Sequence, residues 1–529
     1  MRPTVHRAVY FILLIVLVGA QSVSNYMMSC IEVLLFANWF FEWDMKRKFS
    51  GLFRLGKQHG HSLSLLAAFL ILMAVHFIWM IGSENLSYAL DDIFRKLPLL
   101  AIPLVVLTSR PLNRKQLSFL FNVFIATVFV ATIIGLVRYL SIPDLPYRKI
   151  VPFISNIRFS LNVCFAIVLL VAFFVHARHF LSRASIILLI VWFLFFLLII
   201  RSYTAFFVLL VLLFLMPCLF WRRIVGTKSR LLVFAVQLIV IVTLTAVSVT
   251  MFRDYYRPVP LACQPLQPLT PSGNAYSHAC DGLVENGNYI NNYVCESELR
   301  QQWHRRSSLC IDSLTPNGYA VMPTLVRYLN GMGLAKDSAG VSALTDSDIR
   351  AIEQGIANPV YVNGGPIRKM FYVTLFEVES YRRTGAVKGF SLIERLLLWK
   401  NAWCVFLDNP LFGVGTGDVV DVCHSRLQQI HSPLADTNKH AHSQYLSFLV
   451  AFGLVGTLLI IVAFVIAIRR GRLMRLPLFA AMIIIVLVSF IAEDTLETLA
   501  GCVFSVLFTT IMANSDPAYE IKSTDIHSS

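Results

Sequence analysis

A long apolar helix begins at the end of a polar loop in the stretch Lys439-His440-Ala441-His442-Ser443-Gln444-Tyr445-Leu446-Ser447-Phe448-Leu449-Val450-Ala451-Phe452-Gly453-Leu454-Val455-Gly456. The apolar run continues to about residue 468, which is long enough to cross a bilayer. The imidazole of His442 therefore lies where a membrane span meets water. A titratable base at the water-facing end of a helix bundle favours chemistry on a molecule that is dissolved in the membrane or tethered to it.

The composition of the whole chain is that of an all-α polytopic membrane protein. Of the 529 residues, 57% are hydrophobic and only 14% are charged, whereas a soluble domain carries about a quarter charged residues. No cleavable signal peptide is expected, because a second apolar segment follows the first at once. The apolar runs predict about twelve transmembrane helices, near residues 8–24, 28–43, 62–81, 97–109, 116–140, 160–176, 185–200, 203–221, 231–251, 443–468, 477–492 and 498–513.

The net charge of +15 reflects short basic loops, which all fall on the same side of the membrane if the twelve spans are right, so a nucleic-acid partner is not expected. Excess Lys and Arg mark the cytoplasmic face of a membrane protein. Both termini are then cytoplasmic, and the one long loop is periplasmic. The basic residues are Lys46, Arg47, Lys48, Arg54, Lys57, Arg110, Arg114, Lys115, Arg178, Arg183, Arg222, Arg223, Lys228, Arg230, Arg469, Arg470, Arg472 and Arg475.

The spans divide the chain into four parts. Residues 1–251 form an N-terminal membrane bundle of about nine spans, and residues 252–442 form the periplasmic loop domain. Three C-terminal membrane helices occupy residues 443–513, and residues 514–529 are a cytoplasmic tail. Within the loop, the proline- and cysteine-rich residues 252–317 are expected to be irregular and residues 318–407 mainly helical. A capping box at Ser391–Glu394 predicts a helix that runs to about Leu407.

Cysteine usage agrees with this orientation. Four of the ten cysteines lie in spans, and the other six lie in the outward loop. An even number of cysteines in an oxidising compartment predicts disulfides. Cys404 with Cys423 is one candidate bridge. The pairing of the first four loop cysteines stays open; they are Cys263, Cys280, Cys295 and Cys310.

Several cations fall on the outward side, against the general rule. Arg201 lies in a turn so short that its guanidinium must sit at the mouth of the bundle, and this favours a functional role over a membrane anchor. For Arg158 the two interpretations are equally balanced, and for Arg148 and Lys149 anchoring is preferred. Arg395 lies in the first turn of a predicted helix, where the helix dipole disfavours a cation. It is a candidate for binding phosphate, and an ion pair with Glu394 or another acid is the alternative.

His442 is the candidate base. The N-terminus of a helix disfavours imidazolium, as do nearby arginines, so the ring is expected to be neutral at pH 7 and able to accept a proton. His440 is either a binding partner or a bystander. No residue spacing typical of a metal site stands out, and Asp346-Ser347-Asp348 is better explained as a helix cap. The alternating glycines at Gly413, Gly415 and Gly417 are interpreted as a tight structural turn.

Three acidic residues, Glu493, Asp494 and Glu497, separate the last two predicted spans. They face outward and are interpreted either as ligands for sugar hydroxyls or as helix caps, with capping preferred.

The stretch that begins at His442 resembles a motif of the bacterial O-antigen ligase superfamily, which includes O-antigen polymerases and protein O-oligosaccharyltransferases. In that pattern a histidine and a small polar residue are followed by nine residues, a glycine, two residues and a second small residue. His442-Ser443 and Gly453-Leu454-Val455-Gly456 fit it. Arg395, Trp399, Pro410, Gly413 and Gly415 are similar to the core of the family, Arg201 resembles its external arginine, and Arg158-Phe159-Ser160 resembles a further recurrent segment.

The resemblance implies a glycosyltransferase with a GT-C-like architecture. Such an enzyme moves a glycan from an undecaprenyl-diphosphate carrier to a hydroxyl acceptor, such as lipid A core, at the periplasmic face of the inner membrane. It implies neither a metal nor a cofactor. His442, Arg201 and Arg395 are then the catalytic candidates, and Arg158, His440 and Tyr445 are the candidates for substrate binding. The cysteine-rich insert at 252–317 departs from the family pattern, which leaves the acceptor undefined.

Two alternatives remain open at this point. Within the superfamily, the chain could be a polysaccharide polymerase or a protein O-oligosaccharyltransferase. From another class, a transporter or flippase of lipid-linked sugars would also have about twelve spans. Transporters place their charged groups near the middle of the membrane, whereas the notable charges of this chain gather at its outer mouth. That distribution favours an enzyme.

Overall fold

The computed structural model describes residues 2–42, 60–142, 145, 149–177, 179–221, 226–257, 266–280, 283–436 and 440–515. Arg148, Arg178, Arg222, Arg223, Cys263, Lys439, the basic cluster Lys46–Lys57 and residues 516–529 of the predicted tail lie outside the described residues. The chain divides into two compact units, one made of Met1–Arg230 with Arg395–Ser529 and the other of Leu231–Glu394.

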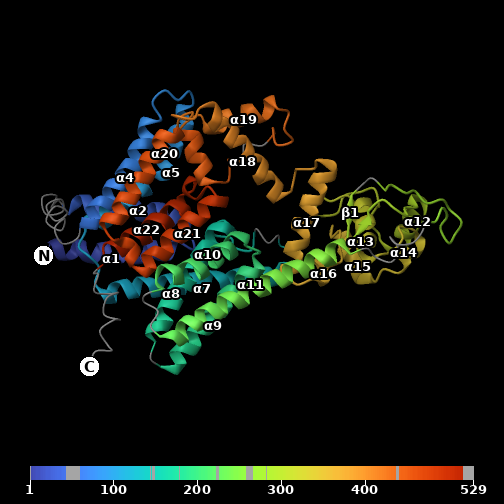
Figure 1. The fold of residues 1–529 in the computed structure, drawn as a ribbon, viewed down its shortest axis with the longest axis horizontal. Helices are drawn as coiled ribbons and strands as arrows, with labels where there is room; N and C mark the ends of the chain where they lie inside the picture. Colours follow the sequence, from blue (N-terminus) through green and yellow to red (C-terminus); the bar gives the residue numbers. More distant parts are fainter. Residues whose placement is uncertain are drawn as a thin grey trace. The chain divides into compact units, whose positions relative to one another are not determined.

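The first unit is a bundle of helices (Figure 1). Its early helices are α1 (Arg2–Ala20), α2 (Asn25–Phe41), α4 (Gly60–Ile78), α5 (Leu86–Lys96), α6 (Pro98–Thr108), α7 (Arg114–Ser141), α8 (Asn156–His176), α9 (Phe180–Ile199) and α10 (Tyr203–Leu219). Its late helices are α18 (Ser391–Asp408), which starts just before the unit boundary, α19 (Val419–Gln429), α20 (Gln444–Arg470), α21 (Pro477–Ala492) and α22 (Leu499–Ala513). Helix α11 (Thr227–Tyr256) begins in this unit and continues into the second.

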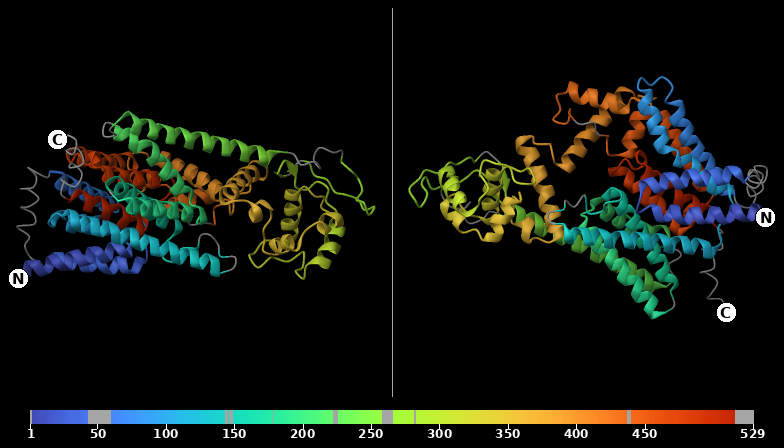
Figure 2. Two further views of the ribbon diagram at one scale, coloured as in Figure 1. Left: turned by 90° about the horizontal axis from the view of Figure 1, so that it is seen from below. Right: turned by 180° about the vertical axis from the view of Figure 1, so that it is seen from behind.

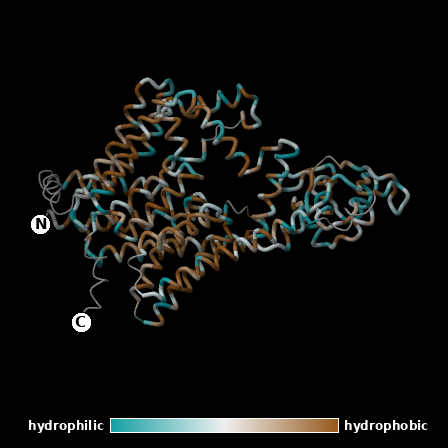
Figure 3. Tube along the Cα trace, viewed as in Figure 1, coloured by the Kyte–Doolittle hydropathy of each residue, from teal (hydrophilic) through white to brown (hydrophobic). Residues whose placement is uncertain are grey.

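Many of these helices have the apolar composition of membrane helices. Five are long and apolar enough to cross one, namely α7, α8, α9, α11 and α20, and shorter apolar helices lie within α1, α4, α10, α21 and α22. Figure 3 shows the apolar colour along the helices of the first unit. Each of the twelve predicted spans falls on a helix, α2 and α6 included. The chain is therefore a mainly helical, multi-pass membrane protein, and the crossing of all twelve stays a prediction.

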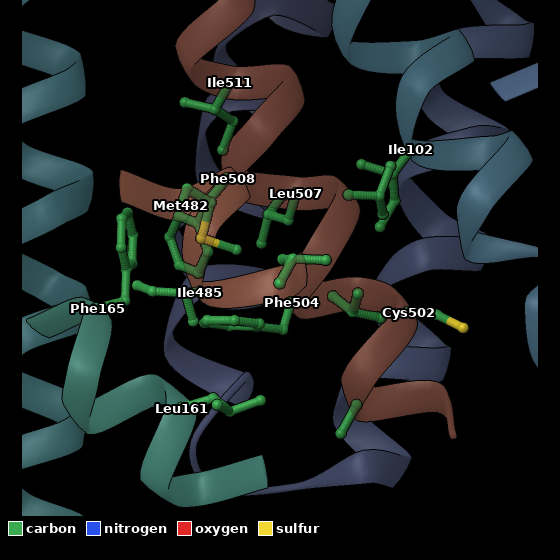
Figure 4. Packing of buried hydrophobic residues seen from close by; sticks show 14 of the residues in the cluster. Ile102, Leu161, Phe165, Met482, Ile485, Cys502, Phe504, Leu507, Phe508 and Ile511 are labelled. Carbon is green, nitrogen blue, oxygen red and sulfur yellow. The ribbon is translucent and has the colours of Figure 1, made fainter. Parts of the chain in front are cut away.

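Helices far apart in the sequence form the core of this unit. Phe165 of α8 packs against Phe504 and Phe508 of α22, with ring centroids 6.3 and 4.7 Å apart. Met482 and Ile485 of α21 lie in the same cluster (Figure 4). Helix α4 packs along α20, and α6 packs along α22. Figure 2 shows red helices from the end of the chain beside blue helices from its start. Helices α21 and α22 are thus buried among the early helices.

Helix α20 is interrupted in its middle, at Gly453. This residue has φ 60° and ψ −163°, a conformation that is essentially restricted to glycine. The break exposes backbone groups, and the glycine-rich segment Pro410–Gly415 pairs with them. Val414 and Gly415 donate to the carbonyls of Val450 and Ala451, both at 2.9 Å, and the N–H groups of Leu454 and Val455 donate back to Pro410 and Leu411 at 2.8 and 3.0 Å. The predicted turn is therefore a close approach of backbone to a helix.

Substitution Gly453→Ala is expected to destabilise the fold by about 3 kcal/mol or more, because it combines a strained φ with a backbone clash. A Cβ at this position would lie 2.4 Å from the backbone of Leu411. Thermal unfolding of the purified protein in detergent measures the effect. Gly19→Ala is the matched control, because its Cβ would meet only Thr127 at 3.6 Å. An equal melting temperature for the two variants would contradict this account of the break.

The second unit carries most of the long loop. It contains a two-stranded hairpin, β1 (Val284–Glu285) and β2 (Asn288–Tyr289), and the helices α12 (Glu296–Arg306), α13 (Val321–Met332), α14 (Ser338–Ser342), α15 (Asp346–Glu353), α16 (Val360–Asn363) and α17 (Pro366–Thr384). Trp303, Leu325 and Tyr328 lie at the centre of its core. Thr345 and Asp348 form a capping box at the start of α15, so the interpretation of Asp346-Ser347-Asp348 as a cap is confirmed.

The structure differs from the expected disulfides. All nine cysteines that it describes carry free thiols, including Cys404 and Cys423. Cys423 instead packs among apolar side chains between α18 and α20, and Cys295 is buried with its Sγ 3.4 Å from the hydroxyl of Ser297. The predicted bridges are therefore wrong for the described cysteines. The buried thiols, those of Cys164, Cys295 and Cys502, fill space as small apolar groups do.

Candidate functional site

The site is organised around the short link between α21 and α22. This link carries Glu493 and Asp494 and then a 3-10 turn, η5 (Thr495–Glu497). Thr498, rather than one of the acids, caps α22 by accepting a hydrogen bond from Gly501. The preferred interpretation of the three acids as helix caps is therefore wrong. Their side chains bind groups from other segments, so a link of a few residues gathers several helices around one point.

Two arginines share the carboxylate of Glu493. Arg158, near the start of α8, reaches Oε2 with Nη1 at 2.8 Å, and Arg395 of α18 reaches Oε1 with Nη2 at 2.6 Å. Arg158 also donates to the carbonyl of Asp494 at 2.9 Å and to Thr498 Oγ1 at 3.3 Å. The Glu493 side chain is only 3% exposed, against 12% and 21% for the two arginines. Removing Glu493 would leave two largely buried guanidinium groups without their shared counterion.

The position of Arg395 explains why a cation is tolerated near the start of α18. Its guanidinium also donates to the carbonyl of Ala492, the last residue of α21. The C-terminus of a helix carries partial negative charge, so the unfavourable dipole of α18 is offset by the favourable one of α21. Of the two alternatives for Arg395, the structure supports an ion pair, and its partner is Glu493 rather than Glu394. An arginine that binds one oxyanion this way is equipped to bind another.

His442 lies directly before α20 and is held to the same link. Its backbone N–H donates to Asp494 Oδ2 at 2.7 Å, and Ser447 of α20 donates to Asp494 Oδ1 at 2.8 Å. The Trp399 indole donates to the carbonyl of His442 at 3.4 Å. His442 has φ 51°, in the left-handed region, which a residue with a side chain adopts at a cost of about 1–3 kcal/mol and mostly at functional sites. Both of its neighbours on the chain are buried, while the ring itself is half-buried.

The surroundings of His442 favour the neutral ring. Burial lowers its pKa, and Arg395 and His440 act in the same direction. Asp494 and Glu493 oppose them without reversing the shift. The lowered pKa of His442 agrees with the expectation from sequence, but its main cause is burial and not the helix N-terminus. For Asp494, burial and then the neighbouring Glu497 raise the pKa of the carboxyl.

Arg201 lies in the turn between α9 and α10. A side-chain hydrogen bond joins this turn to the first part of α8. The hydroxyl of Ser202 donates to that of Ser160 at 2.8 Å, and Ser160 is two residues from Arg158. Arg201 also has a positive φ, 49°, so two of the three catalytic candidates occupy strained backbone. The structure thus brings the Arg201 turn to the helix end that carries Arg158.

The two remaining candidates, His440 and Tyr445, lie on either side of His442. His440 interacts electrostatically with His442, Asp494 and Glu497, and its ring lies 6.4 Å from that of Tyr88 in α5. Tyr445 uses its hydroxyl to donate to the carbonyl of Leu487 at 2.9 Å and so ties α20 to α21. Its part in substrate binding stays a prediction, as does that of His440.

Sequence reasoning missed a buried charge cluster beside His440. Lys96 of α5 lies 2.7 Å from Asp92 and 2.9 Å from Glu497. The available signal was an acid and a lysine four residues apart in a short amphipathic segment between two predicted spans. Within the described ranges, no group of three or more His, Cys, Asp and Glu side chains is arranged to hold a metal ion.

Comparison with known proteins gives one match, in the second half of the chain. Residues 354–461 match the family model described as O-Antigen ligase. The match includes Arg395, the glycine-rich segment, His442 and the break at Gly453, whereas Arg158, Arg201 and Glu493 lie outside it. No curated protein matches the chain. Residues 354–461 therefore match an O-antigen ligase domain, which supports the resemblance of the motif at His442 to the O-antigen ligase superfamily.

Proposed function

We propose that this protein is a glycosyltransferase that moves a glycan from an undecaprenyl-diphosphate carrier to an acceptor hydroxyl, with lipid A core as the acceptor. One observation carries the proposal. His442, Arg395 and Arg158 converge on two adjacent carboxylates, Glu493 and Asp494, at the water-facing end of α20. A base and several guanidinium groups within one small site are what transfer from a diphosphate carrier requires.

The chemistry is a direct displacement at the anomeric carbon. The acceptor oxygen forms a bond to this carbon while its proton passes to the neutral ring of His442. The bond between the anomeric carbon and the carrier oxygen breaks, and its electron pair stays with the leaving diphosphate. Arg395, Arg158 and Arg201 hold the charge that develops there. Since the diphosphate is already a good leaving group, no further activation of the donor is needed, and attack from the opposite face inverts the anomeric configuration.

The proposal includes a topology. About twelve helices cross the inner membrane in a GT-C-like arrangement, with both termini cytoplasmic and the loop of residues 252–442 periplasmic. The basic loops support this orientation, and the helices at the predicted spans are compatible with the number of crossings. The prenyl tail of the carrier then lies in the bilayer beside the bundle, and its diphosphate reaches the arginines at the periplasmic surface.

The acceptor distinguishes the ligase from its relatives. The purified protein is reconstituted in vesicles with undecaprenyl-diphosphate-linked glycan and offered lipid A core, a second lipid-linked glycan or a Ser/Thr-containing protein. Transfer to lipid A core is expected. Transfer only to the second glycan would identify a polymerase, and transfer only to protein an O-oligosaccharyltransferase. Movement of the donor between leaflets without any transfer would contradict the proposal and favour a flippase. Mass spectrometry of the cell envelope from a deletion strain tests the same alternatives in the cell.

The rate of transfer is expected to persist to lower pH than an ordinary histidine would allow. Because burial lowers the pKa of His442, the ring stays neutral through the usual titration range of histidine, near pH 6.5, and loses its function as a base only below that range. Initial rates from about pH 5 to 8 with donor and acceptor in excess measure the midpoint. A midpoint above the usual value would contradict the assignment of this ring as the base.

EDTA is expected to leave the rate of transfer unchanged, because guanidinium groups hold the charge of the leaving diphosphate in this mechanism. The measurement compares initial rates with and without the chelator on the same vesicles. Inhibition that an added divalent cation reverses would contradict this part of the mechanism.

A further inference from the structure

Helix α18 of the predicted periplasmic loop is apolar on two opposite sides. On one side, Ala402 and Val405 are buried in one cluster with Val450 of α20. The other side, with the turn that follows the helix, forms an exposed apolar surface that we call the outer face. Its residues are Trp403, Leu407, Leu411 and Phe412, each between 47% and 61% exposed. A helix that is apolar on opposite sides needs an apolar neighbour on each of them.

The contacts of α18 show that it runs alongside the outer part of α20. Near its start, the Trp399 indole donates to the carbonyl of His442, directly before α20. Just after its end, the carbonyl of Leu411 accepts a hydrogen bond from the N–H of Val455 at 3.0 Å. The chain from 399 to 411 therefore follows α20 from its outer end to beyond the break at Gly453.

The position of Val455 along α20 indicates how deep this segment lies. Helix α20 is long and apolar enough to cross a membrane, and Arg469 and Arg470 in its last turn mark the cytoplasmic side. From Val455 to Arg469 the helix rises by only about 21 Å, and any tilt makes the depth smaller still. The hydrocarbon core of a bilayer is about 30 Å thick. Val455, and Leu411 beside it, therefore lie below the outer surface of that core.

Helix α4 gives an independent estimate of the same level. Trp79, near the outer end of the predicted span 62–81, donates its indole N–H to the carbonyl of Phe412 at 2.6 Å. Tryptophan is enriched where a membrane meets water. Ile78 of α4 and Leu454 and Leu458 of α20 are exposed as well. The outer face is thus continuous with the exposed apolar surfaces of two predicted spans.

The backbone of the turn is suited to this depth. Irregular backbone is tolerated inside a bilayer only where its polar groups find partners in the protein. The carbonyls of Pro410, Leu411 and Phe412 all accept hydrogen bonds from α20 or α4, and the N–H groups of Val414 and Gly415 donate to α20. The turn therefore presents apolar side chains outward while these backbone groups bond inward.

The chain then returns to the water-facing side. The carboxylate of Asp418 accepts hydrogen bonds from the N–H groups of Glu84 and Asn85, in the loop that follows α4. We propose that residues 400–418 form a re-entrant segment, and that its outer face lies among the acyl chains of phospholipids in the outer leaflet. Lys400 is exposed one turn before Trp403, where its long side chain can reach a lipid phosphate.

This inference rests on the membrane crossing of α20 and not on the transfer reaction. It adds to the proposed function a reason for the height of the site. Arg395 precedes Trp403 by about 12 Å along the helix axis. A segment anchored in lipid at Trp403 and Leu407 therefore holds the guanidinium of Arg395 near the lipid headgroups, where the diphosphate of a membrane-bound carrier lies.

Quenching of tryptophan fluorescence tests the proposal. The protein is reconstituted in phosphatidylcholine vesicles with or without bromine on the acyl chains, and the contribution of Trp403 is the emission lost in Trp403→Phe. Brominated lipid is expected to remove most of this contribution, whereas iodide in the water removes little. Trp303→Phe is the matched control. Trp303 is buried in the core of the second unit, so its contribution should be insensitive to brominated lipid.

Substitution Phe412→Trp places a second reporter on the turn. The emission that it adds is expected to be lost in brominated lipid too, since the side chain at this position is the most exposed of the outer face. Quenching of both positions by iodide, without an effect of brominated lipid, would place the outer face in water. Resistance to both quenchers would show that protein covers it. Either result overturns the proposal, and neither depends on glycan transfer, so the proposed function is tested separately.

Discussion

Replacing His442 by alanine is expected to lower the rate of glycan transfer by roughly 10²- to 10⁴-fold, the usual contribution of a positioned general base. The variant should still fold. The hydrogen bonds that fix this position come from the backbone of residue 442, to Asp494 and from Trp399, and alanine preserves both. The measurement is the initial rate of transfer from purified lipid-linked glycan in reconstituted vesicles, together with the melting temperature of the protein.

The control for this variant is His431→Ala. His431 also has a positive φ, 48°, but it is exposed at the end of α19. It tests whether the loss of any imidazole from a strained position affects the enzyme. Full activity in His442→Ala would remove this ring from the mechanism, whereas equal losses in both variants would point to folding and not to catalysis.

Replacing Arg395 by alanine is expected to lower kcat/KM for the lipid-linked donor by roughly 10²- to 10³-fold, which is typical for the loss of one group that stabilises developing negative charge. The change removes the guanidinium that binds Glu493 and the end of α21. Arg395→Lys should recover only part of the rate, because an ammonium group keeps the charge but loses the planar fork of donors. Arg201→Ala is expected to act in the same direction.

Arg426→Ala provides the matched control for Arg395→Ala. Arg426 also forms an ion pair within the first unit, with Asp408 at 2.5 Å, but the side chains of this pair are 31% and 57% exposed. Exposed pairs contribute about 0–1 kcal/mol, so both the rate and the stability should stay close to those of the wild type. A donor kcat/KM for Arg395→Ala as high as that for Arg426→Ala would show that the buried cluster is structural only.

Much of the fold could be predicted from the sequence because membrane helices are recognised by length and hydropathy alone. The twelve predicted segments all fall on helices. Helix α5 was missed because its pattern is amphipathic and short, with Asp92 and Lys96 on one face. The disulfides were predicted only from an oxidising compartment and an even number of cysteines in the loop. A bridge also requires two cysteines to come together with suitable geometry.

The sequence indicated the arginines of the site but not the role of its acidic residues. Arg158 and Arg201 attracted attention because short outward loops should be poor in Lys and Arg, and Arg395 because a cation is disfavoured near the start of a helix. Glu493 was assigned to a helix cap because a carboxylate between two helices fits that role locally. Its two partners come from α8 and α18, distant in the sequence, and no local pattern reports such a pairing. A single sequence therefore indicates which groups are unusual, while the fold decides which of them meet.

The interruption of α20 restricts where insertions and deletions can occur in the chain. Hydrogen bonds at Gly453 are completed by residues 410–415, a segment that lies well before α20 in the sequence. An insertion or deletion within this segment would shift which N–H meets which carbonyl, and Thr416 and Asp418, which bond the end of α4 and the loop after it, would move as well. Homologues should accordingly keep the spacing from Pro410 to Asp418 constant.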